Sequence, residues 1–229
     1  MRGTLYGVGV GPGDKKLLTL MAVETLQNAD KIIVPDMGGE KTALKIVEDY
    51  IQEKEKVFCH LPMTRNEEAL TKAHKIACDI ICEELENGYN LAFITLGDPT
   101  IYSTYMYLHR MVLERGYQAT IINGIPSFCA VAARLNISLC DREEALHIIP
   151  ASYENTEALL GLDGNKVLMK SGKQLGPVIE LLKEKELIQH AKMVECCCMD
   201  TEKIYTNLEE VEESSYFSVV IVRENGGQA

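Results

Sequence analysis

Apolar positions along the first 135 residues alternate between short continuous runs and longer stretches with helical spacing. The run at 4–10 leads into a Gly-Pro-Gly-Asp turn, and apolar residues at helical spacing over 17–29 predict a helix after it. A second run at 31–34 completes a strand–helix–strand unit. The same alternation predicts further helices at 41–51, 67–85 and 103–115, one ending at 135, and strands at 56–59, 91–96 and 118–122. Repeated alternation of this kind indicates a mostly parallel sheet with helices on both faces.

The pattern changes near residues 136–142. Strand-like segments then dominate, and only two helices are predicted, at 154–160 and 174–185. The predicted strands are 145–149, 166–169, 191–196, 203–205 and 218–222. We therefore expect an α/β protein of two domains, 1–138 with a mostly parallel sheet and a smaller one, 139–229, with a mixed sheet.

Composition narrows the class of function. The 229 residues are 46% hydrophobic and 25% charged, which is ordinary globular usage, and the net charge is −11. An acidic chain is poorly suited to nucleic acid, whose phosphates attract clustered Lys and Arg. No apolar run approaches the roughly 20 residues of a membrane span, and no signal peptide is evident at the N-terminus. We expect a cytoplasmic protein that acts on a small molecule.

The cysteines do not predict a metal site. Three of the eight are adjacent, at 196–198, and adjacent side chains alternate faces in a strand, whereas zinc pairs usually have two or more intervening residues. His74, Cys78 and Cys82 follow each other at four-residue intervals, but eight residues of helix span about 12 Å, too far to converge on one ion. Reduced thiols are expected instead.

The glycine-rich segment Gly7–Asp14 fails the nucleotide-binding templates. The dinucleotide pattern G-x-G-x-x-G places Pro12 or Asp14 where its third glycine belongs. The phosphate-loop pattern G-x-x-x-x-G-K-[ST] fails at Lys41-Thr42, because Glu40 stands where the glycine before the lysine belongs. Two interpretations of this segment remain open. It is either a tight turn that lets a ligand approach the backbone closely, or a plain strand-to-helix turn.

Two further loops follow apolar strands. Gly97-Asp98-Pro99-Thr100-Ile101-Tyr102-Ser103 brings a carboxylate and hydroxyl groups to the carboxyl end of the sheet, where open α/β sheets bind ligands. Asp98 could instead be the N-cap of the next helix. Gly124-Ile125-Pro126-Ser127-Phe128 repeats the arrangement one strand later. Three such loops together indicate a binding site more strongly than any one of them.

Taken in order and spacing, these loops and Val167-Leu168-Met169-Lys170 resemble the tetrapyrrole methylase family of S-adenosylmethionine (SAM) methyltransferases. The resemblance covers essentially the whole chain. Within the family, the segments Tyr6–Gly13, 96–108 and Val167–Lys170 look most like the enzymes that methylate C-20 of cobalt-factor II or precorrin-2 in corrinoid (cobalamin) synthesis.

The resemblance implies a two-domain fold with SAM in the cleft between the domains, a tetrapyrrole in an adjoining trough, S-adenosylhomocysteine as product and a homodimer. Carried over residue by residue, it assigns the cofactor contacts to Val10, Gly97, Asp98, Ile101, Ser127, Phe128, Met169 and Cys198, with Ser218 as a further candidate.

The chemistry expected of such a site is mainly positioning. The sulfonium methyl of SAM is already activated, and a reduced tetrapyrrole carbon is itself the nucleophile, so the enzyme must align the two and exclude water. A dedicated general base is therefore dispensable, with Tyr102 the candidate catalytic side chain and Asp36 a second polar group. The carboxylates of the substrate need local cations, for which the candidates are Arg110, Arg115, Arg134, Lys170 and Lys173.

Other functions fit the same residues. A methyltransferase of this fold could act on another tetrapyrrole position, on a diphthamide precursor or on ribosomal RNA. A SAM-sensing module without turnover is the alternative from a different class, and it would need only one pocket, whereas an enzyme needs a second site facing the methyl group.

Overall fold

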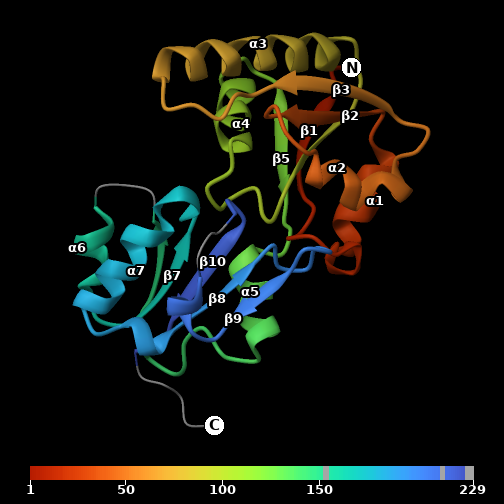
Figure 1. The fold of residues 1–229 in the computed structure, drawn as a ribbon. Helices are drawn as coiled ribbons and strands as arrows, with labels where there is room; N and C mark the ends of the chain where they lie inside the picture. Colours follow the sequence, from red (N-terminus) through yellow and green to blue (C-terminus); the bar gives the residue numbers. More distant parts are fainter. Residues whose placement is uncertain (152–154, 212–214, 225–229) are drawn as a thin grey trace. The chain divides into compact units, whose positions relative to one another are not determined.

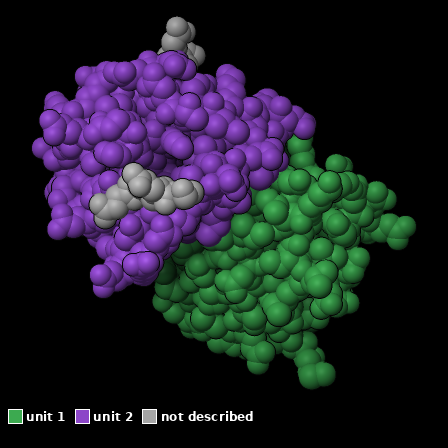
Figure 2. All heavy atoms as spheres, turned by 90° about the horizontal axis from the view of Figure 1, so that it is seen from below, with its two compact units in different colours: residues 1–126 green, residues 127–229 purple. Residues whose placement is uncertain are grey.

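The structure, a computed structural model, describes residues 1–151, 155–211 and 215–224. The chain divides into two compact units, Met1–Pro126 and Ser127–Ala229 (Figure 2). The expected boundary, at 138/139, lies further along the chain. The difference concerns the helix α5, Ser127–Leu135, which packs against the last strand of the second unit and is therefore part of that unit.

The first unit is built on five parallel strands in the order β3-β2-β4-β1-β5 (Figure 1). The strands are β1 (Thr4–Gly9), β2 (Lys31–Asp36), β3 (Glu55–His60), β4 (Leu91–Thr95) and β5 (Gln118–Ile122). The helices are α1 (Leu20–Asn28), α2 (Thr42–Val47), α3 (Glu67–Glu86) and α4 (Tyr105–Glu114), with 3₁₀ turns at Lys15–Leu17 and Glu48–Tyr50. The predicted parallel sheet is confirmed.

Helices cover both faces of this sheet. In β4, Leu91 and Phe93 pack with residues of α3 and α4, whereas Ala92 and Ile94 pack with residues of α1 and α2. This two-sided burial explains why the strand reads as a continuous apolar run rather than as an alternation.

Local signals set the ends of several elements. Thr19 caps α1 by accepting a hydrogen bond from the amide of Ala22, and Asn66 caps α3 in the same way. β2 continues through Pro35 to Asp36, although the sequence predicts that it stops at the proline. Beyond Ile33 this strand pairs with β3 alone, and proline is tolerated where a strand forms a sheet edge.

The second unit contains a mixed sheet in the order β6-β7-β10-β8-β9. β6 pairs with β7 in parallel, and β10 is antiparallel to both of its neighbours. The strands are β6 (Leu146–Pro150), β7 (Asn165–Met169), β8 (Ala191–Glu195), β9 (Lys203–Tyr205) and β10 (Ser218–Val222), and the helices besides α5 are α6 (Thr156–Leu160) and α7 (Leu175–Glu184). The predicted mixed sheet is confirmed, while the predicted start of α6 at Glu154 lies outside the described residues.

The core of this unit forms between α7 and the sheet. Val178 and Leu182 of the helix pack with Leu168, Met193 and Val220 from three different strands. Within the described residues, no helix has both the length and the apolar character that crossing a membrane requires.

Candidate active site

The loops that follow β1 and β4 are joined through their backbones. β1 lies between β4 and β5 in the sheet, so the carboxyl ends of the three strands are neighbours. The amide of Gly11 donates to the carbonyl of Gly97 at 3.2 Å, and the amide of Gly97 donates back to Gly11 at 2.7 Å. Both glycines have positive φ angles, +73° and +71°, a conformation that favours glycine.

The loop after β5 approaches the same point. A Cβ atom added to Gly124 would lie 2.1 Å from the carbonyl oxygen of Gly97, and one added to Gly9 would lie 2.5 Å from the amide nitrogen of Gly124. We call the four residues Gly9, Gly11, Gly97 and Gly124 the glycine junction. Gly9, the last residue of β1, and Gly11, just beyond it, therefore serve close contact between backbones.

Asp98 fastens the β4 loop to the β5 loop. One oxygen of its carboxylate accepts hydrogen bonds from the amide of Thr100 at 2.8 Å and from the Thr100 hydroxyl. The other accepts from Nδ2 of Asn123 at 3.1 Å and from the amide of Gly124 at 3.0 Å. The residue is 5% exposed. Burial raises the pKa of this carboxyl, but the hydrogen bonds from Thr100, Asn123 and Gly124 outweigh it, so the pKa lies below its usual value.

This geometry excludes the N-cap interpretation of Asp98. The helix α4 begins at Tyr105 with Thr104 at its N-cap, six residues beyond Asp98. A carboxylate offers about four lone pairs, and here four protein donors use them. Asp98 is therefore built to position two loops, with little capacity left to accept a hydrogen bond from a ligand.

Tyr102 and Ile101 occupy the outer part of the β4 loop. Tyr102 has φ +48°, an uncommon conformation for a tyrosine, and the residue is 44% exposed. Partial burial raises the pKa of its phenol, so the hydroxyl keeps its proton at neutral pH and can donate a hydrogen bond. Ile101 is half-buried, and Val10, at the end of β1, is fully buried. The structure thus gathers Val10, Gly97, Asp98 and Ile101 at one edge of the first sheet.

In the second unit, the predicted cofactor residues come from three elements. Ser127 and Phe128 are the first two residues of α5. Met169 ends β7, and Cys198 lies in the turn after β8. Because β7 and β8 both run antiparallel to β10, their carboxyl ends lie at the same sheet edge, together with Ser218 at the start of β10. The Ser218 hydroxyl is 2.9 Å from that of Ser171, just beyond β7.

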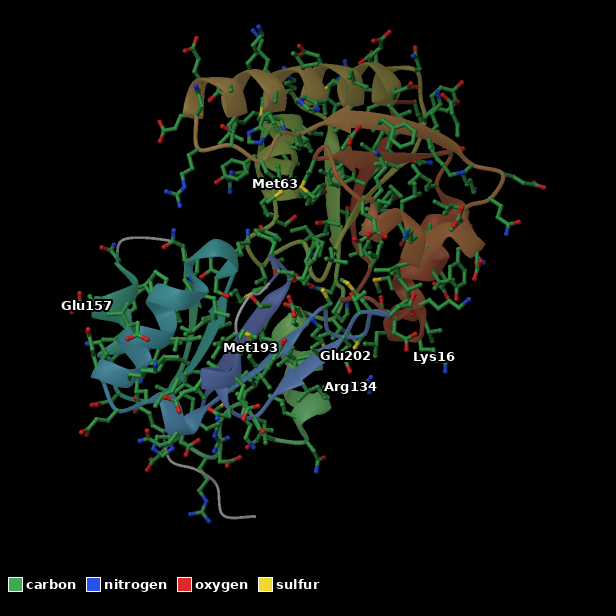
Figure 3. All side chains as sticks on the ribbon, viewed as in Figure 1. Lys16, Met63, Arg134, Glu157, Met193 and Glu202 are labelled. Carbon is green, nitrogen blue, oxygen red and sulfur yellow. The ribbon has the colours of Figure 1, made fainter. Side chains whose placement is uncertain are left out.

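The three adjacent cysteines form a turn rather than the end of a strand. β8 stops at Glu195, and both Cys196 and Cys198 have positive φ angles, 49° and 64°. The amide of Cys198 donates to Oε2 of Glu202 at 2.7 Å, while Oε1 accepts from Nε of Arg134 on α5 at 2.6 Å. Figure 3 shows Arg134 and Glu202 side by side. The prediction that β8 includes Cys196 is wrong, since the left-handed backbone at this residue breaks the extended strand.

Four of the five candidate cations have described side chains, and Arg115 and Arg134 form ion pairs with carboxylates. Arg115 contacts the Asp79 carboxylate at 2.7 Å, and Arg134 is engaged with Glu202. Arg110 lies over the Tyr107 ring at 5.1 Å. Lys170 directly follows Met169, and burial lowers the pKa of its amine. The side chain of the fifth candidate, Lys173, is outside the described part of the chain.

Other groups singled out by the sequence are held away from these edges or paired locally. Asp36 accepts from the amide of Gly38 at 3.2 Å and contacts Lys41, and these partners lower the pKa of its carboxyl. His74 stacks on Tyr107 with ring centroids 5.1 Å apart, whereas Cys78 and Cys82 are buried in the core beneath α3. These three residues do not form a common metal centre.

Sequence reasoning missed two residues that organise the site. Asn123 holds Asp98, and its signal was an Asn-Gly pair directly after a strand. Glu202 binds the cysteine turn and Arg134, and no local signal marked it.

Comparison with known proteins agrees with this architecture. The family model of the Tetrapyrrole (Corrin/Porphyrin) Methylases matches residues 4–212. A probable cobalt-precorrin-2 C(20)-methyltransferase of Methanocaldococcus jannaschii is 35% identical, over 96% of this chain and 95% of its own. The cobalt-precorrin-2 C(20)-methyltransferase of Salmonella typhimurium is 30% identical, over 97% of each chain.

Solved structures share the fold at low sequence identity. A cobalt precorrin-4 methyltransferase superposes with a TM-score of 0.77 at 17% identity, covering 96% of this chain and 94% of its own. A uroporphyrin-III C-methyltransferase of Thermus thermophilus, complexed with S-adenosylhomocysteine, does so with 0.72 at 20% identity, covering 97% and 98%. With a match to the family model over most of its length and full-length relatives at 30% identity or more, this chain belongs to the tetrapyrrole methylases.

Proposed function

We propose that this protein transfers the methyl group of SAM to C-20 of cobalt-precorrin-2, the cobalt-factor II type of substrate, or of metal-free precorrin-2, in cobalamin biosynthesis. The observation that carries the proposal is the 35% identity, over nearly the full length of both chains, to a probable C-20 methyltransferase. A second relative with the same C-20 specificity in its name supports it at 30% identity.

SAM is the proposed cofactor and S-adenosylhomocysteine the product. The residues proposed to bind it are Val10, Gly97, Ile101, Ser127, Phe128, Met169 and Cys198, and Asp98 is proposed to hold the loops in place rather than to accept a hydrogen bond from SAM. The residue types suit this ligand, because SAM carries no phosphate and the junction offers backbone groups beside apolar side chains instead of a phosphate cradle. The bound S-adenosylhomocysteine of the Thermus thermophilus neighbour is consistent with this choice.

In the proposed reaction, the protein's own residues position SAM and the tetrapyrrole relative to each other and exclude water. Bound SAM supplies a methyl group that is already activated for attack by a carbon nucleophile. Asp98 acts here as a positioning residue, since it holds the β4 and β5 loops together. The phenol of Tyr102 keeps its proton and can orient a polar group, and it is unsuited to act as a base at neutral pH. Lys170 is proposed to pair with a substrate carboxylate.

We further propose that the enzyme works in the cytoplasm as a homodimer, without a nucleic-acid or membrane partner. The acidic net charge of −11 supports the first exclusion. Large apolar side chains exposed on the first unit, including Phe58, Met63 and Ile76, give a second copy apolar surface to bind. Light scattering of the purified protein should return twice the chain mass of 25.5 kDa, and a monomeric mass would refute the dimer.

The decisive experiment compares substrates. The protein is incubated with SAM and, separately, with precorrin-2, its cobalt complex and a uroporphyrinogen, and the products are analysed by mass spectrometry and by NMR with a ¹³C-labelled methyl donor. One added methyl at C-20 of either precorrin-2 form is expected, with the uroporphyrinogen unchanged. Methylation at another carbon would favour the same-fold alternative, and SAM binding without any product would favour a sensing module.

A further inference from the structure

The turn after β8 brings three potential metal ligands together. The sulfur atoms of Cys197 and Cys198 are 3.6 Å apart, and one carboxylate oxygen of Glu202 lies within 4.8 Å of both sulfurs. Cys197 is buried, while Cys198 and Glu202 are partly exposed. Adjacent cysteines in a strand would point to opposite faces, but the left-handed backbone at Cys196 and Cys198 turns these two sulfurs toward each other.

The separation of the two sulfurs suits chelation. Two thiolates bound to a tetrahedral zinc ion at about 2.3 Å lie roughly 3.8 Å apart. A disulfide is disfavoured, because neighbouring Cα atoms are only about 3.8 Å apart and disulfides usually span about 4.4 Å or more. The pair is therefore arranged to share an ion rather than to oxidise to a disulfide.

The Glu202 carboxylate is the third ligand, and the combined charge of the three ligands suits a divalent cation. Oε1 of Glu202 accepts from Arg134 and Oε2 from the amide of Cys198. The carboxylate also accepts from the Cys197 thiol, whose proton leaves when an ion binds, so a lone pair becomes available for the ion. Two thiolates and one carboxylate carry three negative charges, which a divalent ion and the Arg134 guanidinium balance. Arg134 also orients the carboxylate, as second partners of metal ligands commonly do.

We propose that Cys197, Cys198 and Glu202 form a binding site for a thiophilic divalent cation of the Zn²⁺ or Cd²⁺ class. Each thiol releases its proton to solvent as its sulfur bonds to the ion, and the fourth position is left to water or another small ligand. Cys198 is also among the residues proposed to contact SAM, so the test of the ion site contains neither SAM nor a tetrapyrrole, and its outcome does not depend on the proposed function.

The test is a titration of the reduced full-length protein with CdCl₂, followed by the thiolate-to-cadmium absorption band in the ultraviolet. We expect saturation at one equivalent, and calorimetry in two buffers of different ionisation enthalpy should show about two protons released per ion. The double variant Cys197→Ser/Cys198→Ser should lose the band. Glu202→Gln should bind about tenfold or more weakly.

Cys78 and Cys82 provide the matched control. Their sulfurs are 3.8 Å apart, but both lie in the apolar core and, within the described part of the chain, no third ligand of the metal-binding types groups with them. The variant Cys78→Ala/Cys82→Ala should therefore keep the one-equivalent band. Loss of the band in this control, or its survival in the Cys197/Cys198 variant, would overturn the proposal.

A measurement on the unaltered protein covers the case in which a variant does not fold. One equivalent of Cd²⁺ should slow alkylation of Cys197 and Cys198, mapped by peptide mass spectrometry, while the exposed Cys140 reacts as before. If Cd²⁺ left the alkylation rates of Cys197 and Cys198 unchanged, as it should that of Cys140, the proposed site would be contradicted.

Discussion

The loops after β4 and β5 are held together by one side chain, that of Asp98. Its carboxylate is buried and accepts four hydrogen bonds from two loops that different strands deliver. Hydrogen bonds to a charged group contribute about 1.5–3 kcal/mol each, and a buried donor that loses its partner is costly. The loop geometry therefore depends on the ionised form of this residue.

The first prediction is a pH-dependent cost of Asp98→Asn. Because the folded-state pKa of Asp98 is lowered, its ionisation stabilises the fold above the ordinary value of 3.8, and this stabilisation is lost as the pH falls through the lowered pKa. Urea unfolding at pH 7 should show a loss of about 2–3 kcal/mol. The difference from the unaltered protein should shrink as the pH falls below 3.8. The exposed Asp200→Asn is the control, and a cost of Asp98→Asn that stays constant down to pH 3 would contradict the mechanism.

The second prediction concerns Tyr102→Phe. The phenol keeps its proton at neutral pH, so its removal deletes a hydrogen-bond donor rather than a base. We expect kcat to fall by at most about 10–100-fold, at or below the lower end of the ~10²–10⁴-fold range for a general acid–base. If the variant lost more than a thousandfold together with one limb of the pH–rate profile, Tyr102 would be an acid–base catalyst.

At the scale of elements, the glycine junction is where three parallel strands end against one another. The close approach of Gly9, Gly97 and Gly124 leaves no room for side chains between their backbones. The order of the strands therefore brings three separate loops together. Their close approach is possible because glycines have no Cβ atom.

The third prediction follows from this crowding. In Gly124→Ala the new methyl group would lie 2.1 Å from a carbonyl oxygen, so a backbone shift must occur, at a cost of about 3 kcal/mol in the free energy of unfolding. SAM affinity should fall in parallel. Gly39→Ala is the matched control, because a Cβ there has nothing within 4 Å, and its effect should stay within about 0.5 kcal/mol. Equal stabilities of the two variants in chemical denaturation would show that the junction relaxes without cost.

Across the whole molecule, the residues proposed to bind the cofactor are divided between the two units. Val10 and Ile101 belong to the first unit, and Phe128 and Met169 to the second. If these residues bind SAM, substitution of one of them in either unit should weaken SAM binding.

The fourth prediction tests the cofactor through stability. A ligand at about 100 times its Kd adds about 2.7 kcal/mol to the free energy of unfolding, so SAM and S-adenosylhomocysteine should raise the melting temperature. NAD and ATP should not, because the chain lacks both nucleotide-binding templates. Ile101→Ala and Met169→Ala should each reduce the SAM effect. A shift caused by NAD or ATP, with none for SAM, would refute the cofactor proposal.

Local signals in the sequence are enough to predict the type and order of the elements. Apolar periodicity predicts α3 over 67–85 against an observed Glu67–Glu86, and the β4 run over 91–96 against Leu91–Thr95. These signals are local, since capping residues, turn glycines and hydrophobic spacing act within a few residues of the chain. The three loops at strand ends were visible for the same reason, and their joint motif was what resembled the methylases.

Which of these local features come into contact depends on the packing of the folded chain. Asp98 accepts hydrogen bonds from Asn123 and Gly124 because only β1 lies between β4 and β5 in the sheet. No local sequence pattern specifies this strand order. The assignment of α5 to the second unit and the meeting of Cys197, Cys198 and Glu202 depend likewise on long-range packing and on a left-handed backbone. Non-local contacts are selected by the free energy of the whole packed chain, so these details lie beyond hydrophobic periodicity.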